Sequence, residues 1–123
     1  MVVDVSRLAA ISTNGATAVV GAGARVIDVY SGLAARCLTI PAGSCPSVGI
    51  GGLALGGGIG FALRKLGTTS DNVLGVRIVT ASGAVLDCDA RHHEDLYWAC
   101  RCGGGATSAS PRRSGSARIR SVA

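Results

Sequence analysis

The chain has 123 residues, a length that allows one small domain with a modest core. Hydrophobic residues make up 48% of it and aromatic residues only 3%, while its 19 glycines favour tight turns or close approach of the backbone to a ligand. The net charge of +5 does not indicate a nucleic-acid partner, because every acidic residue precedes Cys100 and the excess arginines all follow it.

The first third of the sequence predicts two short strands and a helix. Residues 2–5 and 16–21 are rich in valine, and Asn14-Gly15 between them is typical of a turn. Apolar residues then recur at helical spacing, which predicts an amphipathic helix over residues 25–36. No basic and apolar leader opens the sequence, so we expect a cytoplasmic location.

Residues 37–63 contain no charged side chain and are long enough to span a bilayer. Eight glycines and two prolines in this stretch disfavour one continuous helix, because both residue types destabilise helix interiors. We therefore expect an ordered loop that packs against another part of the protein, and no membrane partner.

The second half predicts a helix over residues 59–66 that ends at Gly67. Strands over residues 73–80 and 84–89 are predicted to pair as a hairpin, followed by a helical turn over residues 94–101. No periodicity remains after Gly105, so residues 106–123 are expected to be a disordered basic tail.

Two nucleotide-binding motifs and a metal site are excluded by their spacing. VVGAGARV supplies Gly21 and Gly23 but has Val26 at the third glycine position of a dinucleotide-binding loop, and no acidic residue follows about twenty residues later. No G-K-[ST] closes the glycine-rich stretch as in a P-loop. The five cysteines form no C-x-x-C pair, so we predict no metal site, and we expect no catalytic role for His92 or His93.

Three segments occur in an order and spacing known from one family. The first segment, at 43–67, is GSCPSVGIGGLALGGGIGFALRKLG, with the pattern G-x-C-P-x-V-G-x-G-G, then G-G-G-x-G and R-K-x-G. The second, at 70–86, is SDNVLGVRIVTASGAVL, with D-N at its second and third positions. The third, at 94–101, is EDLYWACR, which is similar to D-L-[FYW]-W-A-x-R. Together they resemble the FAD-linked oxidases, and more narrowly the berberine-bridge-enzyme group with its carbohydrate and nicotine oxidase relatives. The resemblance covers residues 1–105 and implies an α+β fold. That fold is the second lobe of a PCMH-type FAD-binding domain, with a mainly antiparallel sheet of short strands and two or three helices.

The resemblance implies FAD as the cofactor, held against the loop of residues 45–60. Glycines would let backbone N–H groups approach the flavin ring and the pyrophosphate closely. Cys45 stands where many members of the family attach flavin carbon 6 through a thioether; the alternative is a free thiol in a loop. The implied cofactor-binding residues are Ser44, Cys45, Pro46, Ser47, Val48, Gly49, Gly51, Gly52, Gly56 and Val79.

Other residues of the matching segments have a structural interpretation. Asp71 and Asn72 are expected to be turn and capping residues. Leu96, Tyr97 and Trp98 are expected to lie in the core rather than to contact a ligand.

For a complete relative, the resemblance implies oxidation of a C–H bond next to oxygen or nitrogen in a small organic substrate such as a sugar or an alkaloid. We expect this chain to be a fragment, because the family's upstream R-x-G-G-H segment and its substrate domain have no counterpart here. It is then an FAD-dependent oxidoreductase domain fragment, an inactive remnant or a non-catalytic complementing subunit. If the free third bases of the codons are chosen accordingly, residues 106–120 can also be read in a frame displaced by one nucleotide as N-F-G-I-A-T-S-F-R-F-R-T-H-P. This is the continuation that the resemblance implies, so our hypothesis is a frameshift near Gly105.

Overall fold

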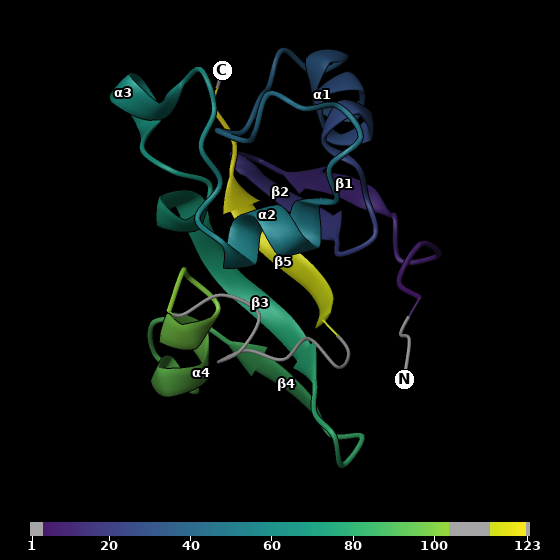
Figure 1. The fold of residues 1–123 in the computed structure, drawn as a ribbon, viewed down its shortest axis with the longest axis vertical. Helices are drawn as coiled ribbons and strands as arrows, with labels where there is room; N and C mark the ends of the chain where they lie inside the picture. Colours follow the sequence, from purple (N-terminus) through teal and green to yellow (C-terminus); the bar gives the residue numbers. More distant parts are fainter. Residues whose placement is uncertain (1–3, 104–113, 123) are drawn as a thin grey trace.

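The computed structural model describes residues 4–103 and 114–122. These residues form short helices and strands in an α+β arrangement (Figure 1). In chain order the elements are β1 (Ile11–Asn14), β2 (Thr17–Gly21), α1 (Val26–Ala34), α2 (Ile50–Leu55), α3 (Leu63–Leu66), a 3-10 turn (Ser70–Asn72), β3 (Val73–Val79), β4 (Val85–Cys88), α4 (Glu94–Ala99) and β5 (Ser114–Arg120). No helix within the described ranges is long and apolar enough to cross a membrane.

The five strands form one antiparallel sheet in the order β1-β2-β5-β3-β4. Two hairpins, β1–β2 and β3–β4, are joined by the last strand of the sequence, which lies between β2 and β3 (yellow in Figure 1). The register places Arg118 of β5 opposite Val19 of β2 and Ala117 opposite Val76 of β3. The centre of the sheet therefore depends on residues far apart in the sequence.

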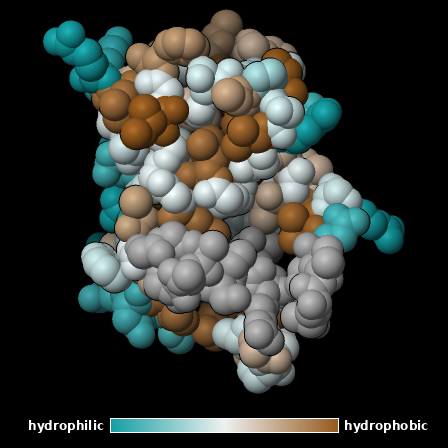
Figure 2. Space-filling model, in the orientation of Figure 1, coloured by the Kyte–Doolittle hydropathy of each residue, from teal (hydrophilic) through white to brown (hydrophobic). Residues whose placement is uncertain are grey.

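The core lies between one face of the sheet and the helices α1 and α2. Its fully buried side chains include Val20, Leu33, Ile50, Val73 and Ile119, each at most 1% exposed. Burying one such side chain contributes roughly 1.5–3 kcal/mol. α2 contacts β2 and β5 and lies across them in Figure 1. Apolar surface on the face drawn in Figure 2 gathers over the part of the molecule that holds α2 and α3.

The predicted helix over residues 25–36, the β3–β4 hairpin, the Asn14-Gly15 turn and the helical turn from Glu94 are confirmed. The predicted position of the strand before the Asn14-Gly15 turn was wrong, because β1 is Ile11–Asn14 rather than residues 2–5. Of residues 2–5, Asp4 and Val5 are described and neither lies in a strand. The Asp4 carboxylate instead accepts a 2.8 Å hydrogen bond from the Ser6 amide, which favours a turn at this point.

The glycine-rich stretch was expected to be a loop, but it contains the six-residue helix α2. Ile50 and Ala54 lie one turn apart and are both buried, so tertiary packing outweighs the low helix propensity of the glycines. α3 begins at Leu63 rather than at residue 59, and it ends at Gly67 as predicted, with φ of 79°. The described residues thus contain four α-helices rather than the expected two or three.

The disorder expected for residues 106–123 is wrong for residues 114–122. Residues 114–120 form β5, and Val122 then pairs with Thr39. Ala117 and Ile119 face the core while Arg118 and Arg120 are exposed, an alternation typical of a half-buried strand. Residues 106–113 lie outside the described residues, and the displaced reading frame stays a prediction.

Candidate functional site

Residues 44–49 form an exposed loop that is anchored on the first turn of α1. All six residues are exposed to solvent. The backbone N–H groups of Val26 and Ile27 donate hydrogen bonds to the carbonyl oxygens of Val48 and Pro46, at 2.9 and 3.1 Å. These N–H groups lie in the first turn of the helix and have no partner within it. The two hydrogen bonds therefore pair donors of α1 with carbonyl groups of the loop.

A side chain of α1 fixes the entry to this loop. The Tyr30 hydroxyl donates a 3.0 Å hydrogen bond to the carbonyl oxygen of Gly43, two residues before Cys45. Partial burial raises the pKa of Tyr30, which keeps the hydroxyl protonated and able to donate. The Cys45 thiol is therefore exposed on a loop that is held in place on both sides.

The exposed loop also holds backbone N–H groups that are not used by the fold. Within the part of the chain that the structure describes, the amides of Ser44, Cys45, Ser47 and Gly49 donate no hydrogen bond to protein. Exposed amides of this kind bind water or the oxygen atoms of a ligand, and successive free amides favour anionic groups.

The glycines of the predicted site fall into two groups. A Cβ on Gly51 would lie 2.8 Å from the carbonyl oxygen of Ala22, so glycine is needed there for packing. A Cβ on Gly49 or Gly52 would meet nothing within 4 Å, and Gly49 has φ of −72°, which any residue can adopt. Neither packing nor backbone conformation within the described residues explains glycine at these two positions.

Gly56 and Val79 complete the predicted set, and they are placed differently. Gly56 ends α2, where its amide donates to the carbonyl of Gly52 at 3.1 Å. Val79 lies at the hairpin end of β3, paired with Val85. Its neighbour Ile78, which the sequence did not single out, lines a cavity beside α2 instead.

This cavity is an apolar space of about 40 Å³ between α2 and the sheet. Its lining residues are Val20, Ala22, Ile50, Gly51, Ala54, Leu55, Val76, Ile78, Cys100, Ser116 and Ala117. The alternation of apolar residues along β3 and the helical spacing of Ile50 and Ala54 are the sequence signals that could have identified part of this lining. A space of this size holds at most a few water molecules, so it is too small to be the binding site of a cofactor ring.

Asp71 and Asn72 are turn and capping residues, as predicted. The Asn72 side-chain amide donates to the carbonyl oxygens of Leu66 and Thr68, at 2.7 and 2.9 Å. The Asp71 carboxylate accepts from the backbone amide and the hydroxyl of Thr68, both at 2.8 Å, and the backbone bond is the main reason that the pKa of Asp71 is lowered. Both side chains therefore shape the turn between α3 and β3.

The expectation that residues 96–98 lie in the core is confirmed for Tyr97 and wrong for Trp98. Tyr97 is 9% exposed, and its hydroxyl donates a 2.6 Å hydrogen bond to the carbonyl of Val73. Leu96 packs against the core while half-buried. Trp98 is 68% exposed, because Tyr97 and Leu96 already fill the face of this short helix that meets the sheet.

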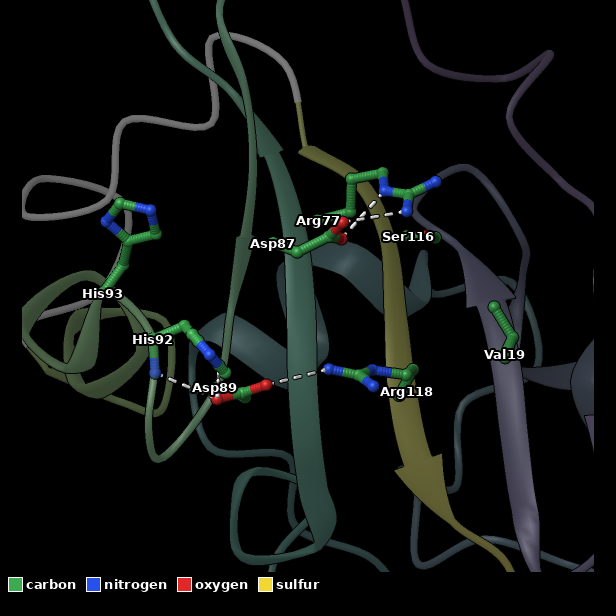
Figure 3. A pocket seen from close by; sticks show the side chains of 8 residues that line it. All are labelled: Val19, Arg77, Asp87, Asp89, His92, His93, Ser116 and Arg118. Atoms are coloured by element: carbon green, nitrogen blue, oxygen red, sulfur yellow. Dashed lines mark hydrogen bonds and ion pairs between the residues drawn. The ribbon is translucent and has the colours of Figure 1, made fainter.

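A second hollow, of about 600 Å³, lies on the opposite face of the sheet (Figure 3). Arg77 and Asp87 form a bidentate ion pair in which both N···O distances are 2.9 Å. The Asp89 carboxylate contacts the Arg118 guanidinium at 3.4 Å and the His92 ring at 3.0 Å. Its charged side chains are thus paired with one another, which is typical of a solvated surface rather than of a cofactor site. Figure 3 shows the His93 ring standing apart from these pairs.

The sequence of residues 1–89 matches the FAD binding domain family. This match covers more than half of the chain, and the exposed loop, its free amides and its glycines all fall inside it. The chain belongs to the FAD binding domain family.

Individual relatives agree with this assignment. A berberine bridge enzyme-like protein, Cyn d 4 of Cynodon dactylon, is 46% identical over 108 residues, which is 85% of this chain and 20% of that protein. The solved structure of Physcomitrella patens BBE-like 1 matches with a TM-score of 0.86 and 42% identity, over 95% of this chain and 25% of that one. A glucooligosaccharide oxidase from Acremonium strictum, described as carrying a 6-S-cysteinyl, 8α-N1-histidyl FAD, matches with a TM-score of 0.83 and 29% identity, over 94% and 24%. The chain therefore spans about a fifth to a quarter of the length of these relatives.

Proposed function

We propose that residues 44–52 form one wall of an FAD site in a flavin-dependent oxidoreductase. The observation that carries the proposal is the open space at Gly49 and Gly52, where nothing in the described chain requires glycine. Glycine at an exposed helical position such as Gly52 costs about 1 kcal/mol relative to alanine. Close approach of a flat ligand to the backbone offers a reason for that cost, and FAD is the ligand of the family to which the chain belongs.

The residues present suit an FAD molecule. The free amides of Ser44, Cys45 and Ser47 can donate to the carbonyl oxygens of the ring or to the pyrophosphate. They belong to a loop fixed by α1, so little conformational entropy is lost when a ligand binds. Side chains at Gly49 and Gly52 would stand between the ligand and this backbone.

Cys45 is proposed as the point of covalent attachment to flavin carbon 6. Its thiol is free and exposed, at the position of the G-x-C-P pattern, and the glucooligosaccharide oxidase is described as carrying a 6-S-cysteinyl FAD. The new C–S bond would replace the thiol S–H and the ring C–H, and the two protons and two electrons released would reduce dioxygen to hydrogen peroxide. Such a link would hold the ring against the loop after the protein is denatured.

For the whole protein we propose oxidation of a small organic molecule. The chemistry that FAD would supply when bound is acceptance of a hydride from a C–H bond next to oxygen or nitrogen, with the electrons passed on to dioxygen. A sugar or an alkaloid is the proposed substrate class, because one relative is named glucooligosaccharide oxidase and another, from Argemone mexicana, tetrahydroberberine oxidase. The second is 43% identical over 101 residues.

The flavin wall can be tested by alkylation of the exposed thiols. The 123-residue polypeptide presents few donors, so we expect it to be colourless as purified and to bind FAD with a Kd of about 1 mM. At that FAD concentration iodoacetamide should modify Cys45 about twofold more slowly, because half of the sites are occupied. Peptide mass spectrometry reports each cysteine separately, and Cys37 and Cys102 are exposed references in the same molecule.

Equal alkylation rates at Cys45 with and without FAD would overturn the flavin wall. Slowing at all three exposed cysteines would also count against it, because it would indicate nonspecific binding. The covalent link has a separate test in the whole protein, which should carry flavin: flavin absorbance that survives denaturation should be lost in Cys45→Ala, and its persistence in that variant would exclude Cys45 as the attachment point.

A further inference from the structure

The segment before the exposed loop is hydrogen-bonded to a buried turn that is distant from it in sequence. The Thr69 hydroxyl donates a 2.6 Å hydrogen bond to the carbonyl oxygen of Pro41, four residues before Cys45. Thr69 has no exposed surface, so water does not compete for this bond. A buried carbonyl that loses its partner is costly, which makes the bond specific to a hydroxyl at this position.

The segment after α2 is fastened to the same turn. The backbone amides of Thr69 and Ser70 donate to the carbonyls of Gly58 and Gly57, both at 2.9 Å. The Ser70 hydroxyl, on a residue 4% exposed, donates to the carbonyl of Ala54 at 2.5 Å. The turn of residues 69–70 thus holds the C-terminal end of α2 and the two glycines beyond it.

The contact at Gly58 requires close approach. A Cβ on Gly58 would lie 2.2 Å from the Thr69 Oγ1, and the φ of Gly58 is 76°, a conformation that favours glycine. Gly58 is therefore explained by Thr69, in contrast to Gly49 and Gly52. Residues 41–58, which contain the loop and α2, are closed into a ring by bonds from one buried turn.

We infer that Thr69 is a positioning residue for the flavin wall, acting through the spacing that it sets between Pro41 and Gly58. The inference rests on the proposed function for its ligand and on the hydrogen bonds above for its mechanism. Without the hydroxyl, Pro41 is released from the turn while Gly57 and Gly58 remain bonded to it. The entry to the loop then moves relative to α2, and the amides near Cys45 no longer face one flat ligand together.

Three variants at two neighbouring threonines distinguish the effect of the Thr69 hydroxyl from that of the rest of its side chain. Thr69→Val keeps the shape of the side chain and removes the hydroxyl, whereas Thr69→Ser keeps the hydroxyl and removes a methyl group. Thr68→Val makes the same chemical change one residue earlier, where the hydroxyl bonds only with Asp71. Each folded variant is tested for protection of Cys45 by FAD at about 1 mM, with wild type measured beside it.

The expected result is loss of the twofold protection in Thr69→Val and its retention in Thr69→Ser and Thr68→Val. Without FAD, the amides of Ile50 and Gly51 should exchange about tenfold faster in Thr69→Val. If wild type shows no protection, the flavin wall itself fails. If wild type and Thr69→Val are protected alike, the wall stands and the positioning role is overturned.

Should Thr69→Val fail to fold, hydrogen exchange in the wild-type chain decides the question. The amides of Thr69 and Ser70 should then open together with those of Ile50 and Gly51, as one cooperative unit. Independent opening of the two pairs would overturn the inference.

Discussion

A Cβ on Gly51 would lie 2.8 Å from the carbonyl oxygen of Ala22, whereas one on the adjacent Gly52 would meet nothing within 4 Å. The two glycines are neighbours in α2 and point in different directions, one into the fold and one out of it. The first is explained by how α2 packs against the turn after β2. The second has no explanation in the described fold and is central to the proposed FAD site.

This contrast predicts opposite effects of the same substitution. Gly51→Ala should lower the free energy of unfolding by about 1–3 kcal/mol, because the new methyl group forces α2 away from Ala22. Gly52→Ala should raise it by about 0.5–1 kcal/mol, since alanine is the better helix former and the space is open. Urea denaturation measures both. Equal effects of the two substitutions would show that α2 does not pack as described.

The five cysteines should differ in reactivity in the folded chain. Cys37, Cys45 and Cys102 are exposed, while Cys88 and Cys100 are buried. Burial is the main reason that the pKa of both buried thiols is raised, so little of either is present as the reactive thiolate. Burial also keeps the alkylating reagent from reaching them. Native alkylation should modify three cysteines quickly and Cys88 and Cys100 only after unfolding. Rapid modification of Cys100 would contradict the packing of α4 on the sheet.

Asp89 should make stability depend on pH in the acid range. The backbone amide of Arg91, followed by the His92 side chain, lowers the pKa of Asp89 to about 2 from an ordinary value of 3.8. The folded state therefore favours the ionised carboxylate, and this stabilisation is present above about pH 4 and is lost as pH falls toward 2. Asp89→Asn should flatten that part of the stability curve.

The control for Asp89→Asn is Glu94→Gln, which makes the same change of charge at an exposed residue of α4. Thermal unfolding between about pH 2 and 5 compares the two variants with wild type. If Asp89→Asn keeps the wild-type slope in this range, the hydrogen bonds to Asp89 do not form in solution.

The central position of β5 can be tested at Ile119. Its side chain is fully buried in the core, so Ile119→Ala should lower the free energy of unfolding by about 2–5 kcal/mol. Arg120→Ala, at the next and exposed position, should change it by less than about 0.5 kcal/mol. Two equally small effects would indicate that residues 114–120 do not join the sheet.

The sequence predicted elements whose signal is local. A valine-rich segment and a turn dipeptide located β2, helical spacing located α1, and the two strands predicted on either side of residues 81–83 located the β3–β4 turn. β5 was missed because its alternation spans few residues and two arginines obscure it; its burial comes from β2 and β3, which are distant in sequence. α2 was missed because glycine propensity disfavours it, while the packing of Ile50 that stabilises it is tertiary.

The candidate site was predicted as a segment, but not in its detail. The position of Cys45 and the glycine pattern came from the resemblance, and the structure adds that the loop is exposed and anchored on α1. Which glycines serve packing depends on Ala22 and Thr69, and no spacing rule in the sequence identifies those contacts. Val79 remains a prediction, since it lies at the far end of β3.

Blocking the open side of α2 is the most direct test of the flavin wall. Gly52→Leu fills the space next to the loop with a good helix former, and Gly32→Leu makes the same change at an exposed position of α1, where a Cβ meets only ordinary contacts with Ile11. The measurement is the rate of Cys45 alkylation with and without FAD at about 1 mM in wild type and both variants. The flavin wall predicts about twofold protection in wild type and Gly32→Leu and none in Gly52→Leu, with all three chains folded. Equal protection in all three would contradict it.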